Sequence, residues 1–275
     1  MGQEGKIMIR KPSVSIVVPN FNQGRFLEEA LQSIIKQPQL DIRIAVMDAG
    51  STDQSVAIIR KYENYISYWQ SKPDNGQAAA INEGVALLPP SDYVCWLNAD
   101  DVFLENGLAR MVDYLETNNQ CMAVYAKAYI TDIDNQVIAP YKTESFSQKG
   151  LATQCFICQP ATLMRTEAWN KVGGLNASLQ MCLDYDLWWR LSKVGEFGYL
   201  TDFVACSRDH EGTKTRNNQK THFNEAFQLL KKYNGYVPLN WCLARATAKE
   251  IHDPNIIRKF VQKLLGCLFY IRYRL

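Results

Sequence analysis

The chain has 275 residues, a formal net charge of +2, and 47% hydrophobic and 21% charged residues. This length suits one large α/β domain, alone or with a smaller extension. The near-neutral net charge argues against nucleic-acid binding driven by the charge of the whole protein. The sequence contains no run of ~18 apolar residues of the kind that spans a membrane, and its first eleven residues lack an apolar segment of signal-peptide length.

The eight cysteines lie largely within apolar runs, where cysteine packs as a small hydrophobic residue. Cys155 and Cys158 have CxxC spacing, but no second pair or histidine pattern accompanies them to complete a zinc site. We therefore expect reduced, buried thiols and a cytoplasmic protein.

The first hundred residues alternate short apolar runs with segments of helical periodicity. The predicted strands are 13–19, 42–47, 66–69 and 93–97, and the helices predicted between them are 25–37, 54–62 and 77–88. This β-α alternation with short links predicts a mostly parallel sheet with right-handed crossovers. The predicted fold class is therefore α/β, with a central sheet flanked by helices.

Polar side chains follow each of these four strands. They are Asn20 and Asn22 after the first, Asp48 after the second, Lys72 and Asp74 after the third, and Asn98, Asp100 and Asp101 after the fourth. In open α/β sheets ligands bind beyond the carboxyl ends of the strands, so we expect a site on this rim. The preference of turns for Asn and Asp explains any one of these positions, but poorly explains all four.

The segment WLNADD places Asp100 and Asp101 side by side at the end of the fourth strand. Carboxylate oxygens suit hard cations such as Mg²⁺ or Mn²⁺, and Mg²⁺ is usually held by one or two protein carboxylates together with phosphate oxygens. Such a cation would offset the charge of a departing diphosphate. The alternative is that Asp101 only caps a helix at 104–114, and the two roles are compatible if Asp100 binds the metal.

Past residue 108 the pattern is less regular. The predicted helices are 111–117, 167–172, 184–194 and 218–233, the predicted strands are 122–130 and 197–205, a hairpin turn is predicted at 132–135, and 141–160 is expected to be irregular. The tail, 254–275, has the pattern of a basic amphipathic helix. It either packs on the domain or lies on an anionic membrane surface, at the inner face of the membrane.

Several segments, in this order, resemble family 2 glycosyltransferases, which have the GT-A nucleotide-sugar fold. They are VSIVVPNFNQGRFLEEALQSI, AVMDAGSTDQS, SKPDNGQAAAINEGV, WLNADD, QPATLMR, GGL, LDYDLWWRL and RDHEGTKT, and they cover about residues 13–216. The resemblance implies metal-assisted, inverting transfer of a sugar from a nucleotide diphosphate, by preference UDP, to a glycan or lipid-linked acceptor in surface-polysaccharide or cell-envelope synthesis. It divides the chain into an N-terminal tail (1–12), a nucleotide-sugar-binding half (13–108), an acceptor-binding and catalytic half (109–216) and a C-terminal helical extension (217–275).

The resemblance also implies roles for single residues on the donor side. The nucleotide and sugar would be bound by Pro19, Asn20, Asn22, Asp48, Lys72, Asp74, Gln77, Asn98 and Lys214, with Asp48 on the base. Asn98-Ala99-Asp100 matches the family's Asp-x-Asp motif, in which Asp100 would hold the metal, and His210 is a further candidate to reach the metal or the diphosphate. Asn98 departs from this motif, which has an aspartate at this position. The asparagine amide can hydrogen-bond a hydroxyl but adds no charge.

On the acceptor side, Asp184 and Asp186 fall where the family keeps the base that removes a proton from the acceptor hydroxyl. The alignment favours Asp184, with Asp186 as the second candidate, and residues two apart on a helix do not share a face. A position at a helix N-terminus predicts a lowered pKa for Asp184. Further acceptor-side candidates are Gln159, Arg165 and a sugar platform of Trp188 and Trp189, with core packing as the alternative for the tryptophans.

Rival functions are less well matched. Nucleotidyltransferases usually have a glycine-rich, basic loop after the first strand, whereas PNFNQGR has one glycine and one arginine. The G-x-G-x-x-G pattern of a dehydrogenase is absent, as is the Gln-x-x-Arg-Trp motif of processive synthases. A non-catalytic nucleotide- or glycan-binding module would explain Asn98, but retention of Asp100, Asp184 and Lys214 argues against it.

Overall fold

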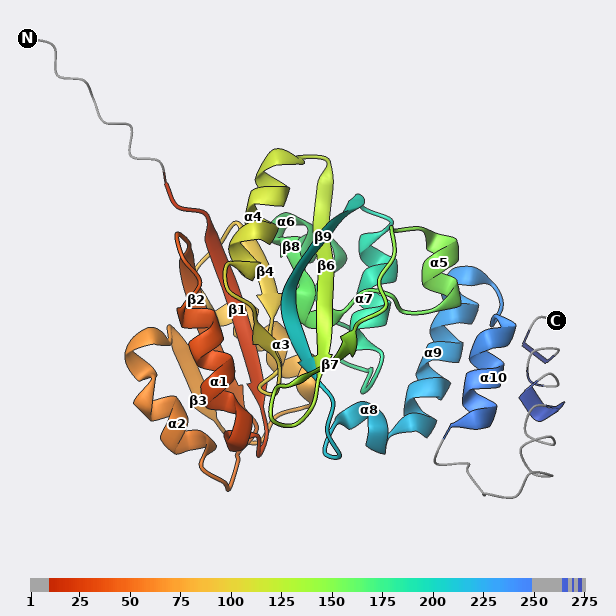
Figure 1. Ribbon diagram of the computed structural model, residues 1–275, viewed down its shortest axis with the longest axis horizontal. Coiled ribbons are helices and arrows are strands. Elements are labelled where there is room, and N and C mark those ends of the chain that lie inside the picture. The colour runs from red at the N-terminus through yellow and green to blue at the C-terminus, as the bar shows by residue number, and fades with distance from the viewer. Residues whose placement is uncertain (1–9, 249–263, 267–268, 270–271, 274–275) are drawn as a thin grey trace, which may run out of the picture.

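The computed structural model describes residues 10–248, 264–266, 269 and 272–273. A nine-stranded sheet forms its centre, with the strand order β3-β2-β1-β4-β8-β6-β9-β5 and with β7 paired to β6 (Figure 1). The strands are β1 Ser13–Asn20, β2 Asp41–Asp48, β3 Tyr68–Ser71, β4 Tyr93–Trp96, β5 Val102–Phe103, β6 Cys121–Thr131, β7 Val137–Pro140, β8 Thr162–Arg165 and β9 Glu196–Arg208.

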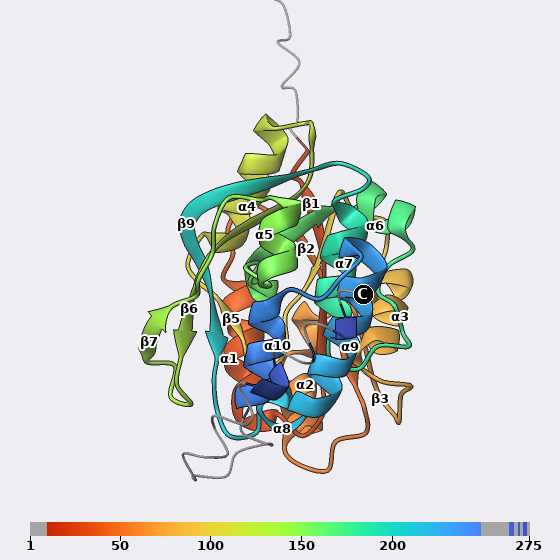
Figure 2. The ribbon, with the colours of Figure 1, turned by 90° about the vertical axis from the view of Figure 1, so that its right-hand side faces the viewer.

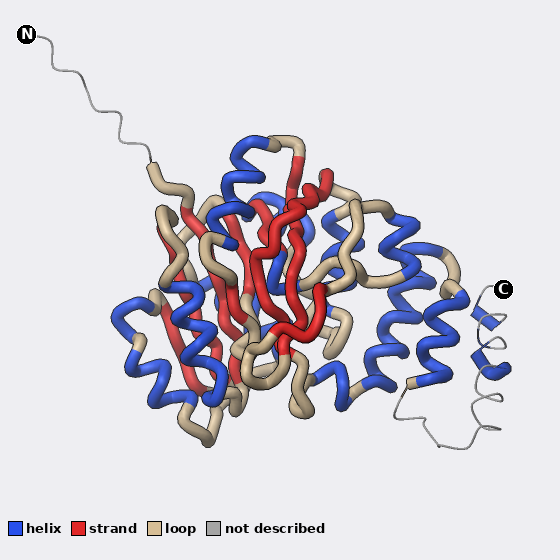
Figure 3. Tube along the Cα trace, viewed as in Figure 1, coloured by secondary structure: helices blue, strands red, loops and turns tan. Residues whose placement is uncertain are grey.

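Helices cover both faces of this sheet (Figure 3). They are α1 Gly24–Ile35, α2 Ser55–Lys61, α3 Gln77–Leu87, α4 Gly107–Thr117, α5 Gln148–Thr153, α6 Thr166–Val172, α7 Leu183–Leu191, α8 Lys214–Asn217, α9 Gln219–Asn234 and α10 Leu239–Thr247, with short 3-10 turns η1 Glu63–Tyr65 and η2 Gln159–Ala161. The two faces hold separate apolar cores, one containing residues of α1 and α4 and the other residues of α3, α6, α7 and α9.

The burial of β1 explains why its sequence is a continuous apolar run. Ile16 belongs to the core beside α1, whereas its neighbour Val17 belongs to the core beside α3, because successive side chains of a strand point to opposite faces. A strand covered on both faces has no polar side, which is the usual pattern of parallel sheets. The parallel pairing of β1 with β2 and β4, and of β2 with β3, agrees with the prediction for the first half.

The second half of the sheet is mixed rather than parallel. β8 runs antiparallel to both β4 and β6, while β6 and β9 are parallel. The sequence pattern did not predict β5, β8, α5 or α10. Since β4 and β8 lie in one sheet, the proposed division at residue 108 is not a break in the structure, and it stays a functional prediction.

The C-terminal helices lie beside α7, at the end of the molecule away from β3 (Figures 1 and 2). α9 buries Phe223, Phe227 and Leu230 on its apolar face, and Tyr233 stacks on Trp189 of α7 with ring centroids 5.6 Å apart. Most of the predicted tail helix at 254–275 lies outside the described residues. None of the helices within the described ranges has the length and apolar character needed to cross a bilayer.

Candidate active site

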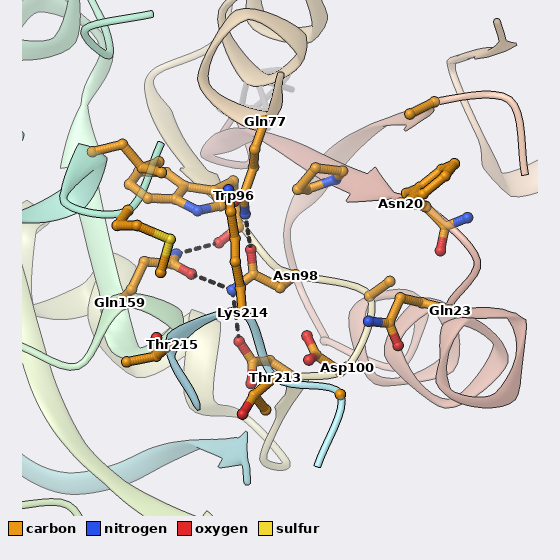
Figure 4. Close-up of a pocket in the computed structure, with 18 of the residues that line it drawn as sticks. Asn20, Gln23, Gln77, Trp96, Asn98, Asp100, Gln159, Thr213, Lys214 and Thr215 are labelled. Carbon is orange, nitrogen blue, oxygen red and sulfur yellow. Dashed lines mark hydrogen bonds between the residues drawn. The ribbon is translucent and has the colours of Figure 1, made fainter. Parts of the chain in front are cut away.

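A cavity of about 730 Å³ opens at the carboxyl ends of β1 and β4 (Figure 4). Its size lies in the range of small-molecule sites. The residues predicted from the sequence that line it are Pro19, Asn20, Asp74, Gln77, Asn98, Asp100, Gln159, Asp184 and Lys214. Segments far apart in the chain thus converge on one cavity, as expected for the rim of an open α/β sheet.

Asp100 faces this cavity and is paired with His210. His210 Nε2 lies 3.2 Å from Asp100 Oδ2, and the Gly212 backbone N–H donates to His210 Nδ1 at 3.2 Å. Because Nδ1 accepts a hydrogen bond, the neutral ring carries its proton on Nε2 and donates it to Asp100. With this tautomer His210, which is 8% exposed, is a hydrogen-bond donor to Asp100, and its predicted contact with the metal or the diphosphate stays a prediction.

The donor set fits a divalent cation that arrives with a diphosphate. Among the described residues no group of three His, Cys, Asp or Glu side chains is placed to hold a metal. Asp100, with 18% of its side chain exposed, supplies one available carboxylate. That suffices for Mg²⁺ or Mn²⁺ when phosphate oxygens and water complete the shell.

Asp101 has a structural role. Its side chain is buried, accepting hydrogen bonds from the Arg208 backbone N–H and from Asn98 Nδ2, each at 3.0 Å. Burial and the neighbouring charge of Asp100 raise the pKa of Asp101 to about 8. Since α4 begins at Gly107 after Asn106, Asp101 does not cap that helix, and it instead joins the end of β4 to β9.

Asn98 is the centre of a chain of amide hydrogen bonds across the cavity (Figure 4). Its Oδ1 accepts from Gln77 Nε2 at 2.8 Å, and its Nδ2 donates to Asp101 Oδ2 and, at 3.1 Å, to Gln159 Oε1. Lys214 Nζ extends the chain by donating to Gln77 Oε1 at 3.2 Å, and burial lowers the pKa of Lys214. An aspartate at position 98 could not donate to Asp101 and Gln159, so these neighbours explain the asparagine.

Asp48 lies beneath the cavity rather than in its wall. Its carboxylate is 1% exposed and accepts hydrogen bonds from Ser51, Ser71 and Asn20. Burial alone would raise the pKa of Asp48, but the hydrogen bonds from Ser51, Ser71 and Asn20 outweigh it and hold this pKa below its ordinary value. Asp48 thus orders the turn after β2, and a nucleobase could bond to it only by displacing a present donor.

Two other predicted donor-site residues are directed elsewhere. Asn22 has a positive φ of 52° and accepts a hydrogen bond from the Thr52 backbone N–H at 2.8 Å, so it shapes the turn after β1. Lys72 forms an ion pair with Glu83 at 3.4 Å. Neither side chain is among those that line the cavity, so a contact of Asn22 or Lys72 with the donor stays a prediction.

Asp184 and Asp186 have different environments although both lie in the first turn of α7. Asp184 lines the cavity, whereas Asp186 is 1% exposed and accepts hydrogen bonds from Arg190 Nε at 2.7 Å and Tyr233 OH at 2.8 Å. Asp186 is therefore a structural ion-pair partner, and its prediction as a second candidate base is wrong. Burial raises the pKa of Asp184 to about 6, opposite to the lowering predicted from its helix position, because desolvation outweighs the helix dipole.

The predicted tryptophan platform is also wrong. Trp188 and Trp189 are 0% and 3% exposed, so their rings belong to the core. The tryptophan that reaches the cavity is Trp96, which stacks on Trp188 with centroids 6.1 Å apart. Trp96 is the first residue of the WLNADD segment. Its position at the end of β4 is the sequence feature that indicates a side chain near the cavity.

Arg165 lies at the other end of the sheet from the cavity. Its guanidinium donates to the carbonyls of Cys121 and Leu115, and it pairs with the ring of Tyr93 at the start of β4. The prediction that Arg165 shapes the acceptor side is therefore wrong. The sequence reading also missed Phe21, Gln180 and Met181, which line the cavity but stand in turns with no chemical pattern.

Removing the partner of the buried Asp186 should destabilise the fold. Arg190→Met is expected to lower the free energy of unfolding by about 3 kcal/mol, because it leaves a buried carboxylate poorly paired. Urea denaturation measures this change. The control is Arg216→Met, which breaks an exposed pair with Asp209 and should cost under ~1 kcal/mol. Equal losses in the two variants would contradict the structural role of Asp186.

Residues 15–173 match the family model described as "Glycosyl transferase family 2". The chain belongs to this family. As a family 2 glycosyltransferase it also has the expected fold: TarS of S. aureus, solved with UDP-GlcNAc, superposes with a TM-score of 0.63 at 13% identity over 94% of this chain and 92% of that one. The mannosyltransferase PcManGT from Pyrobaculum calidifontis, solved with GDP-Man and Mn²⁺, gives 0.64 at 15% identity over 94% of this chain and 76% of that one. The prediction of a GT-A fold is confirmed.

Curated relatives of this glycosyltransferase include polysaccharide synthases. Chondroitin synthase of Escherichia coli is 27% identical over 86% of this chain and 36% of its own length, and hyaluronan synthase of Pasteurella multocida is 27% identical over 81% and 24%. The uncharacterized glycosyltransferase RP339 of Rickettsia prowazekii is 27% identical over 82% of this chain and 73% of its own length. The chain thus spans about a third or less of the two named synthases.

Proposed function

We propose that this glycosyltransferase moves a sugar from a nucleotide diphosphate, by preference UDP, to a hydroxyl of a glycan or lipid-linked acceptor, with inversion at the anomeric carbon. The supporting observation is that one cavity is lined both by Asp100, the carboxylate available to a cation, and by Asp184, whose pKa of about 6 lies near neutrality. These two groups are what a single displacement needs: a partner for the departing diphosphate and a base for the attacking hydroxyl.

The leaving diphosphate would lie between Asp100 and Lys214. A bound Mg²⁺ or Mn²⁺ would supply charge stabilisation of the diphosphate. On the protein side, Lys214 brings an ammonium group, held by Gln77, and His210 brings an Nε2–H donor beside Asp100. Partial burial strengthens each of these interactions with developing negative charge.

At the acceptor side Asp184 would act as the base. Its carboxylate takes the proton of the acceptor hydroxyl while the oxygen of that hydroxyl bonds to the anomeric carbon and the bond from this carbon to the diphosphate oxygen breaks. A pKa of about 6 leaves Asp184 ionised at neutral pH, and it makes the group a better proton acceptor than an ordinary aspartate. One displacement with one base inverts the anomeric configuration.

The nucleotide of the donor and the class of the acceptor are supported by the relatives and neighbours. TarS and PcManGT were solved with a UDP-sugar and a GDP-sugar respectively, so both bases need to be tested, and the preference for UDP rests on the family resemblance around Asp48. The relatives named as chondroitin and hyaluronan synthases support a polysaccharide acceptor. A cytoplasmic location, with contact to the inner membrane face, is part of the same proposal.

The test is a donor screen by mass spectrometry with Mn²⁺ and Mg²⁺. The enzyme is incubated with a panel of UDP- and GDP-sugars, with and without glycosaminoglycan oligosaccharides and lipid-linked sugars. We expect one donor to be consumed faster when an acceptor is present, with a mass gain of one sugar on that acceptor. Nucleotide binding without turnover would instead favour a non-catalytic module, and transfer of a nucleotidyl group would favour a nucleotidyltransferase.

A further inference from the structure

A carboxylate from the C-terminal extension holds the backbone directly in front of α7. Glu225 of α9 is 9% exposed, and it accepts hydrogen bonds from the backbone N–H groups of Gln180 at 2.8 Å, Met181 at 2.9 Å and Cys182 at 2.9 Å. Glu225 lies beyond residues 15–173, which match the family model. No motif of the sequence analysis includes it.

Of these three N–H groups, that of Cys182 has a specific need for an acceptor. Cys182 is the buried N-cap of α7 and provides no side-chain cap, and the first N–H groups of a helix have no partner within it. Gln180 and Met181 precede the helix and are less buried. A buried N–H without an acceptor is strongly unfavourable. Three convergent donors and the positive end of the α7 dipole in turn satisfy the buried charge of Glu225.

The segment that Glu225 holds is part of the candidate active site. Gln180 and Met181 line the cavity, and Asp184 follows Cys182 by two residues. A carboxylate that fixes the backbone at 180–182 therefore also fixes where α7 begins and how Asp184 enters the cavity. A shift of about 1 Å in such a group can lower a rate by roughly 100-fold.

We propose that Glu225 is a positioning residue for the transfer reaction: it holds residues 180–182 so that Asp184 faces the acceptor hydroxyl. This inference rests on the proposed function of Asp184. Helix α9 then helps to set the geometry of the active site in addition to covering the core. On the donor side, Asp100 and Asn98 follow β4 and bond to Arg208 and Gln159 rather than to α9, whereas Lys214 lies close enough to Glu225 for this carboxylate to raise the pKa of Lys214.

A second contact between the same two helices provides a matched control. Tyr233 of α9 donates to Asp186 of α7 at 2.8 Å, and neither residue lines the cavity. Tyr233→Phe therefore loosens α9 from α7 without releasing residues 180–182. A second control, Gln228→Ala, changes an exposed side chain of α9.

The experiment compares Glu225→Gln, Glu225→Asp, Tyr233→Phe and Gln228→Ala in the 275-residue chain. For Glu225→Gln we expect kcat to fall about 10- to 100-fold, because the base is displaced. KM for the donor and Kd for UDP should rise by a smaller factor, because on the donor side the variant changes the charge near Lys214 but leaves Asp100 in place. Hydrogen exchange at 180–182 should accelerate. Glu225→Asp, which keeps the charge on a shorter side chain, should recover part of kcat, and the two controls should keep kcat even where the urea midpoint falls.

Two results would overturn the inference. One is a kcat within twofold of wild type in Glu225→Gln although exchange at 180–182 has accelerated. The other is a parallel loss of kcat, UDP affinity and urea midpoint in Glu225→Gln and Tyr233→Phe, which would make the contact merely structural. Failure of the proposed function looks different, since the wild-type enzyme would then transfer sugar from none of the donors.

Discussion

Asp184→Asn is expected to lower kcat by about 10²- to 10⁴-fold while UDP affinity stays within about twofold. Removal of a general base costs a rate of this order, and the asparagine amide cannot accept the proton of the acceptor hydroxyl. Initial rates at saturating donor and acceptor measure kcat, and calorimetry measures UDP binding. Because Asp184 lines the cavity from α7, whereas Asp100 follows β4, the two measurements should separate.

The pH dependence of kcat should follow the ionisation of Asp184. Burial raises the pKa of this carboxyl to about 6, so kcat should be roughly level above pH 7 and should fall roughly tenfold for each unit below pH 6, as the base becomes protonated. The residual activity of Asp184→Asn should lack this acidic limb. An acidic limb that persists in the variant would assign the titration to another group.

Stability gives an independent check that Asp184→Asn has folded. A carboxyl whose folded-state pKa is raised above its unfolded value destabilises the fold as pH rises through the folded pKa, here about 6. The asparagine amide does not ionise, so the variant avoids this destabilisation, and its urea midpoint at pH 8 should equal or exceed that of the wild type.

Asp186→Asn should show the converse pattern, with a lower urea midpoint and nearly unchanged kcat, because Asp186 is bonded to Arg190 and Tyr233. A large loss of kcat in Asp186→Asn with kcat retained in Asp184→Asn would reverse the assignment of the base.

The donor side of the site was predictable because its signals are local. The run Ser13–Asn20 forms a buried strand, and the rim position of Asn98 and Asp100 follows from the strand that precedes them. By contrast, nothing near Asn22 or Lys72 indicated that Thr52 and Glu83 would engage them. A sequence pattern places a residue near the rim, but its partners decide whether it faces the ligand.

The acceptor side was less predictable because its geometry depends on α9. Tyr233 of that helix donates a hydrogen bond to Asp186 and stacks on Trp189. A carboxylate and a tryptophan that the sequence pattern predicted to be functional are therefore structural. The raised pKa of Asp184 is also a tertiary effect, since the position of this residue on α7 alone predicts the opposite direction. Glu225 lies more than forty residues beyond Cys182, with no pattern that joins them. Such contacts are visible only once the chain has folded.

Asp100→Asn is expected to lower kcat/KM for the donor by about 10²-fold or more, which corresponds to roughly 3 kcal/mol of transition-state stabilisation. Asparagine keeps the shape and can still accept the hydrogen bond from His210, so the loss would come from the missing charge. In the wild type, Mn²⁺ should tighten UDP binding and EDTA should reverse this effect. In Asp100→Asn, UDP affinity should be low and nearly the same with Mn²⁺ and with EDTA.

The matched control is Glu105→Gln, which removes an exposed carboxylate five residues further along the chain and should leave both kcat/KM and the effect of Mn²⁺ unchanged. Asp101 cannot replace Asp100, because it is buried and bonded to Asn98 and Arg208. His210→Gln should therefore have a smaller effect than Asp100→Asn, since His210 acts as a hydrogen-bond donor beside the carboxylate. If Asp100→Asn retained UDP binding that Mn²⁺ tightens and EDTA weakens, the cation would have to be held elsewhere, and the role proposed for Asp100 would be wrong.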